Sequence, residues 1–137
     1  MAMAEGNSSW GKITTPSDGK NVLSVGAIDT SGIVAAFSSR GFEGSETVKP
    51  DVLAVGTQTS IITSIGTIGI GYGTSFSAPQ IAGFTACLWQ ANPEKTNLEI
   101  IDAIRKSSSR YANPDIVHGY GIPNFMLALW ILNGLNE

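Results

Sequence analysis

The sequence predicts an α/β fold made of short parallel strands, a β-hairpin and three helices. Two runs, 22–28 and 52–55, are short, apolar and rich in β-branched residues, which is typical of strands that a sheet buries on both faces. Two further runs, 59–63 and 67–72, flank a turn at residues 64–66 and predict the hairpin. The helices are expected after this hairpin, where apolar segments alternate with polar ones.

Polar segments around the first two strands predict loops. Residues 1–20 are polar, glycine-bearing and irregular, so no fold element is expected there. A turn is expected at 29–32, a short extended piece at 34–38 and a polar loop at 41–47. The two buried strands are thus expected to be joined by mostly irregular chain.

The first two helices differ in their patterns. The segment from Ser75 to about Ala91 is apolar on nearly every side, so this helix is expected to be buried all round. Thr96 and Glu99 have the spacing of a capping box, which predicts a second helix at 97–107. The inward stripe of that second helix is expected to be Leu98, Ile101 and Ile104.

The last helix is expected between Asn124 as its N-cap and Gly134 as its terminator. Residues 125–132 between them are apolar without a break, so this helix needs cover on all sides. It is too short to cross a bilayer, which takes about 20 apolar residues.

Composition narrows the classes of function. With 137 residues, 8 Lys and Arg and 11 Asp and Glu, the chain has the size of one domain, and its scattered basic residues do not predict a nucleic-acid partner. The single cysteine, Cys87, excludes an internal disulfide and is expected in the packed core. No signal peptide, membrane span or metal-ligand spacing is recognisable, so localisation stays unknown from the residues.

A glycine-rich turn runs directly into the first helix and offers Ser75 as a candidate nucleophile. Gly71 and Gly73 permit backbone angles closed to other residues, so the chain can turn sharply and present Ser75 at the helix start. Pro79 is expected in the first helical turn, where a missing N–H costs nothing. A hydroxyl there lies beside unpaired N–H groups and the positive end of the helix dipole, which suits a developing oxyanion. The alternative is that Ser75 merely caps a buried helix.

The helix start is Gly73-Thr74-Ser75-Phe76-Ser77-Ala78-Pro79 and is followed by Ile81-Ala82-Gly83. It resembles the serine motif of the subtilisin-like serine peptidases. Four further stretches occur in the order and spacing seen in that family, at 21–27, 37–41, 49–56 and 119–124. The resemblance therefore covers nearly the whole chain.

The resemblance implies that residues 1–137 are a single partial domain, the C-terminal half of the three-layer catalytic domain of a serine endopeptidase. It implies that Ser75 is the nucleophile and that its backbone N–H belongs to the oxyanion hole, with motif support from Gly73, Thr74, Ala78 and Pro79. Peptides or proteins would be the substrates. No cofactor is expected, although family members often carry calcium, and the parent enzyme would be secreted or held at the cell envelope.

The family's second oxyanion donor is an asparagine side chain in a segment that ends in Ala-Gly-Asn. We expect the matching place just before Glu5-Gly6, where this sequence has Ala4. Loss of one such donor costs on the order of 10²–10³ in turnover. The resemblance also implies that loop residues 10–16 lie near the pocket for the side chain before the scissile bond.

A serine hydroxyl needs a base, and the base needs a third group to orient it. The family's acid and histidine precede the serine, in an N-terminal half that this sequence lacks. The one histidine, His118, falls at a position that the family does not use, so we interpret it as a surface or loop residue. A rival hypothesis joins Ser75 and His118 to Asp102 or Asp115 in the order used by α/β-hydrolases. That fold's elbow has glycine two residues after the serine, where this chain has Ser77.

The chain alone is therefore expected to be inactive. A catalytic domain cut near its middle would leave strand 22–28 without one neighbour and expose helix faces, so the alternative function is a non-catalytic fragment that self-associates as a homo-oligomer. Asp51 is interpreted as a structural residue rather than as the catalytic acid.

Overall fold

A three-stranded parallel sheet lies at the centre of the fold, in the order β1-β2-β3. The computed structural model describes residues 1–8 and 11–135. The strands are β1 (Ala2–Ala4), β2 (Leu23–Ile28) and β3 (Val52–Val55). All six residues of β2 are buried, as predicted for a strand covered on both faces.

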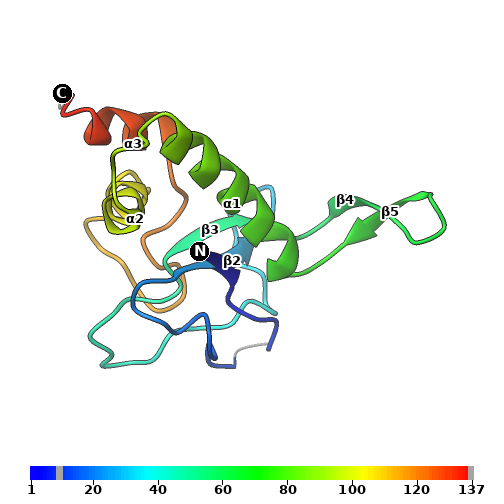
Figure 1. Ribbon diagram of the computed structural model, residues 1–137. Coiled ribbons are helices and arrows are strands. Elements are labelled where there is room, and N and C mark those ends of the chain that lie inside the picture. Colours follow the sequence, from blue (N-terminus) through cyan, green and yellow to red (C-terminus); the bar gives the residue numbers. More distant parts are fainter. Residues whose placement is uncertain (9–10, 136–137) are drawn as a thin grey trace.

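The core lies between one face of this sheet and the helices α1 (Thr74–Gln90), α2 (Asn97–Lys106) and α3 (Phe125–Leu132). In Figure 1, α1 crosses the sheet, while α2 and α3 lie together near the C-terminal end of α1. Side chains alternate along a strand, so Leu23 and Val25 of β2 face this core. Ser24 and Gly26 therefore face the opposite side, beneath which long loops run. The predicted α/β class is confirmed.

The predicted helix signals are confirmed by side-chain contacts. Thr96 and Glu99 form both bonds of the capping box at the start of α2. Asn124 accepts the N–H of Leu127 at the start of α3. Gly134 follows the end of α3 with a φ of 69°, a left-handed conformation that glycine adopts without strain.

The hairpin projects from the body of the molecule (Figure 1). It consists of β4 (Thr59–Ile62) and β5 (Ile68–Gly71), paired antiparallel with Ser60 opposite Ile70 and Ile62 opposite Ile68. The prediction of a hairpin is confirmed. The face that carries Ile62, Ile68 and Ile70 is exposed in the described chain.

Three local expectations are wrong. Residues 1–20 are not all loop, because Ala2–Ala4 form β1 and pair with β2. A strand of three residues is too short to be predicted from its own sequence pattern. The piece at 34–38 is not extended throughout, because Val34 forms an isolated bridge with Ile28 but residues 36–38 are turn and bend. Leu98 is 49% exposed, and the buried residues of α2 are Ile100, Ile101, Ala103 and Ile104.

The expectation that α1 is buried on every side is also wrong for the chain described. Its buried residues lie on one side, against the sheet, whereas Phe84 and Trp89 are exposed. Cys87 is exposed rather than part of the core. Met126 and Trp130 of α3 are exposed as well. Apolar helix faces therefore lie open on the surface of this chain.

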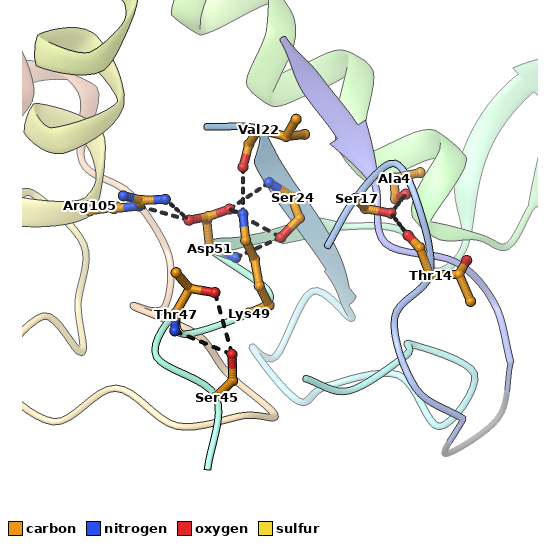
Figure 2. Close-up of polar contacts among 10 residues, drawn as sticks. All are labelled: Ala4, Thr14, Ser17, Val22, Ser24, Ser45, Thr47, Lys49, Asp51 and Arg105. Carbon is orange, nitrogen blue, oxygen red and sulfur yellow. Dashed lines mark hydrogen bonds and ion pairs between the residues drawn. The ribbon is translucent and has the colours of Figure 1, made fainter. Parts of the chain in front are cut away.

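Asp51 is a structural residue, as predicted. Its fully buried carboxylate accepts bonds from Lys49 Nζ at 2.6 Å, Arg105 Nε at 2.7 Å and the N–H of Ser24 at 2.7 Å. Figure 2 shows these side chains converging on one carboxylate from three different parts of the chain. The cluster ties the start of β3 to β2 and to α2.

Candidate active site

The start of α1 is fixed against the carboxyl end of β3. Gly73 N donates to Gly56 O at 2.8 Å, and Ser77 Oγ donates to Ala54 O at 3.0 Å. A Cβ on Gly56 would lie 2.4 Å from Ser77 Oγ, so only glycine permits this approach. The carboxyl ends of parallel strands are where open α/β sheets place their ligand sites.

Ser75 is exposed and is the second residue of α1. Within the described chain, neither its hydroxyl nor its backbone N–H has a hydrogen-bond partner, and no side chain caps this helix end. The interpretation of Ser75 as an ordinary helix cap is therefore not supported. Its N–H points out of the helix at the positive end of the dipole, where it can donate to a bound anion or oxyanion.

Pro79 is not in the first turn, which corrects that expectation. The helix begins at Thr74, so Pro79 is its sixth residue and lies in the second turn. Having no N–H, it leaves the Ser75 carbonyl without the donor that a regular helix would supply. The other motif residues have structural roles: Thr74 is 1% exposed, and Ala78 belongs to the hydrophobic core.

Asn7 lies at the start of α1, although the sequence analysis did not predict it as a site residue. Its Oδ1 accepts both the N–H and the hydroxyl of Thr74, each at 2.9 Å. The Thr74 hydroxyl in turn accepts the N–H of Gly6 at 3.3 Å. Both lone-pair directions of Oδ1 are thus occupied, and Nδ2 has no hydrogen-bond partner among the described residues. This nitrogen lies 2.9 Å from the point where a Cβ on Gly73 would be, so it is at the helix start and Gly73 must lack a side chain.

Ala4 does not occupy a comparable place. It lies in β1 and packs against the hydrophobic core, so a longer side chain at position 4 would face the core and not the start of α1. Glu5-Gly6-Asn7 shares its last two residues with the family's Ala-Gly-Asn, and this match leaves Glu5 as the departure. Trp10, the first residue of the loop expected near the substrate pocket, lies outside the described residues.

His118 and Ser75 lie at opposite ends of β3. Gly119, next to His118, is so close to Pro50 O and Asp51 O at the start of β3 that a Cβ there would overlap them. The start of α1, in contrast, bonds to Ala54 and Gly56 at the end of that strand.

His118 pairs with Asp115 through Nδ1 at 3.0 Å, and Asp102 pairs with Lys106. Among the described residues neither acid is bonded to Ser75, and His118 lies at the other end of β3. The rival triad is therefore not assembled.

A cavity lies apart from the site. A largely apolar cavity of about 630 Å³ is lined by β3, α1 and the start of α3, but Ser75 and Asn7 do not line it. No group of three or more His, Cys, Asp or Glu residues in the described part could hold a metal ion. No described helix combines the length and apolarity that crossing a membrane requires.

Comparison with known proteins agrees with this geometry. The profile of the Subtilase family matches residues 1–122. Subtilisin E from Bacillus subtilis (strain 168) is 32% identical over 132 residues, which cover 93% of this chain and 33% of the relative. Subtilisin from Bacillus pumilus is 31% identical over 132 residues, covering 93% of this chain and 46% of the relative.

A solved structure of the self-cleaved protease domain of PatA superposes with a TM-score of 0.80 and 27% identity, covering 98% of this chain and 50% of that one. The fold of this chain is thus shared with part of a protease domain. The chain belongs to the Subtilase family, and it spans a third to a half of the length of these relatives.

Proposed function

We propose that this chain supplies the nucleophile and both oxyanion donors of a subtilisin-like serine endopeptidase. The observation that carries the proposal is the exposed Ser75 at the start of α1, next to an Asn7 carboxamide that Thr74 holds by its oxygen. Ser75 is the nucleophile, and its own N–H and Asn7 Nδ2 are the donors. The substrates are peptides or proteins.

In this mechanism Ser75 Oγ attacks the carbonyl carbon of the scissile peptide bond. The carbonyl oxygen becomes an oxyanion and accepts hydrogen bonds from the Ser75 N–H and from Asn7 Nδ2. As the tetrahedral intermediate collapses, the proton taken from Ser75 passes to the leaving nitrogen, the C–N bond breaks and the amine departs. An acyl ester remains on Ser75, which water hydrolyses. The donors are held before the substrate arrives, so no reorganisation is needed as the charge develops.

The proton of Ser75 must be removed by a base outside these residues. His118 lies at the other end of β3 and is bonded to Asp115, so it does not reach the serine. We therefore propose that residues 1–137 are a partial domain, inactive alone, and that the base and its acid come from additional chain. The apolar faces of α1 and α3 suit such a segment. Export of the parent enzyme and calcium bound by backbone carbonyls remain predictions.

A fluorophosphonate probe tests this function. The chain alone should be labelled slowly or not at all, whereas a fusion to the base- and acid-bearing part of a subtilase should be labelled rapidly and stoichiometrically on Ser75. Ser75→Ala should abolish labelling, and Ser64→Ala, a change at an exposed hairpin serine, should not. Rapid labelling of the chain alone would mean that a base lies within it. Labelling of the fusion at another residue would refute the proposal.

A second candidate function, self-association without catalysis, is favoured by a separate observation. Phe84 and Trp89 of α1 and Met126 and Trp130 of α3 are exposed, and β1 has a partner on one edge only. Such surfaces drive association between copies when nothing else covers them. Sedimentation of the chain should then show dimers or larger species. A well-folded monomer at high concentration would contradict this candidate.

A further inference from the structure

The carboxyl group of Glu5 is enclosed beneath the sheet, on the face opposite the helices. Glu5 is 1% exposed, the Ser38 hydroxyl donates to its Oε1, and its Oε2 has no hydrogen-bond partner in the described chain. It lies over Gly26 of β2, where an added Cβ would be 2.9 Å from Oε1 and 2.7 Å from a methyl of Leu53. The missing side chain at Gly26 therefore makes the room that Glu5 occupies.

The Ser38–Ser39 segment, which contacts Glu5 through Ser38, also hydrogen-bonds through Ser39 to the residues on either side of Asn7. Ser38 bonds to Glu5, the N–H of Ser39 donates to Gly6 O at 3.2 Å, and the hydroxyls of Ser39 and Ser8 lie 2.8 Å apart. Ser38 is itself fixed, because its hydroxyl accepts the N–H of Ala27 at 2.8 Å. Displacing the Glu5 side chain would thus disturb the backbone from which Asn7 projects.

We propose that Glu5 is a positioning residue for Asn7 and that its protonation controls how firmly Asn7 is held. The neutral carboxyl keeps the Ser38–Ser39 segment and the Gly6–Asn7 turn together, and ionisation loosens them. This inference rests on the proposed function in one respect, since that function makes Asn7 Nδ2 an oxyanion donor. Glu5 itself touches neither substrate nor the reacting atoms.

The enclosure of Glu5 disfavours its charged form. Burial raises the pKa of Glu5 to about 8, because the charged form loses its water, and the Ser38 hydrogen bond offsets this only in part. An ionised carboxylate with an unpartnered Oε2 is costly in this setting and favours movement toward water.

No charged residue appears among the contacts of this carboxyl in the described chain. Those contacts are Gly26 of β2, Leu53 of β3 and Ser38. The causes of the pKa shift are burial, which raises the pKa, and the Ser38 hydrogen bond, which lowers it. Asp51, just before β3, is the charged residue nearest to Leu53 in the sequence. The Asp51 carboxylate is bonded instead to Lys49 and Arg105.

The test follows the full chain by carbon-detected NMR, which does not depend on exchangeable protons. The side-chain carbonyl resonances of Glu5 and Asn7 are recorded from about pH 6 to about pH 10, on either side of the raised pKa. Both should shift together, with one midpoint near 8. Glu5→Gln should remove the transition at Asn7. The matched control Glu43→Gln, at an exposed loop carboxylate, should keep it.

An Asn7 resonance that does not change with pH in the wild-type chain would overturn the proposal, as would a Glu5→Gln chain in which Asn7 titrates with the same midpoint. If Glu5→Gln does not fold, the paired titration of the wild-type chain decides alone. None of these measurements uses catalysis. Failure here therefore leaves Ser75 as the proposed nucleophile, and failure of Ser75 labelling leaves the coupling of Glu5 to Asn7 intact.

Discussion

The hydroxyl of Thr74 lies 2.9 Å from Oδ1 of Asn7, although the two residues are 67 positions apart. The Thr74 N–H approaches the same oxygen at 2.9 Å. Two donors on one carboxamide oxygen fix the orientation of the group, and its NH₂ end is left to serve another acceptor. The helix start and the segment that follows β1 are thereby joined next to Ser75.

The Asn7→Asp variant separates the two roles of Asn7, which are to accept hydrogen bonds from Thr74 and to donate one to the oxyanion. Its carboxylate can still accept both bonds from Thr74, but it has no N–H for the oxyanion and adds a negative charge. In the fusion that carries base and acid, kcat/KM should fall on the order of 10²–10³ or more while the fold is retained. Asn21→Asp, at an exposed position, is the control. A rate within about twofold of wild type would exclude Asn7 as a donor.

Thr74→Val should destabilise the chain. It keeps the side-chain shape but removes the hydroxyl that accepts from Gly6 and donates to Asn7. Urea denaturation should show a loss of about 1–3 kcal/mol in the free energy of unfolding, because buried polar groups lose partners. Thr74→Ser, which keeps the hydroxyl, should recover most of this. Equal stability of the valine variant and wild type would mean that the hydrogen bonds of the Thr74 hydroxyl to Gly6 and Asn7 do not stabilise the fold.

The stability of the chain should depend on pH through Glu5. The carboxyl has a pKa near 4.5 when solvated and about 8 when folded. Between these values the folded state keeps a proton that the unfolded state has lost, so the free energy of unfolding falls as pH rises through this window and levels off above it.

The fall should be on the order of a few kcal/mol, since one pKa unit corresponds to about 1.4 kcal/mol. Glu5→Gln should flatten this part of the profile, and Glu43→Gln should not. Denaturant unfolding at several pH values measures both. A wild-type profile that rises steadily across the window would contradict the assignment.

Removing the Asp51 carboxylate should be far more damaging than removing an exposed one. Asp51→Asn leaves Lys49 buried without its charge partner, at a cost of about 3–5 kcal/mol in unfolding free energy. Asp102→Asn breaks the exposed pair with Lys106 and should change stability little, because solvent screens exposed ion pairs. Thermal or urea unfolding of the two variants side by side gives the comparison. Similar losses would mean that the buried cluster is not a structural anchor.

Local patterns in the sequence predict most of this fold, because they reflect contacts within a few residues. The buried strand 22–28 and the capping box of Thr96 and Glu99 are of this kind. Contacts between distant segments leave no such pattern. β1 becomes a strand only beside β2, and Asn7 joins the site only through Thr74. Ser75 could be proposed from its glycine-rich turn, whereas the burial of Glu5 depends on the space above Gly26.

The most direct test of the central claim is a crystal structure of the phosphonylated fusion. Phosphorus should be bonded to Ser75 Oγ, and one phosphonyl oxygen should lie about 2.7–3.1 Å from both the Ser75 backbone nitrogen and Asn7 Nδ2. A phosphonyl oxygen turned away from both nitrogens, or an adduct on a different side chain, would contradict it.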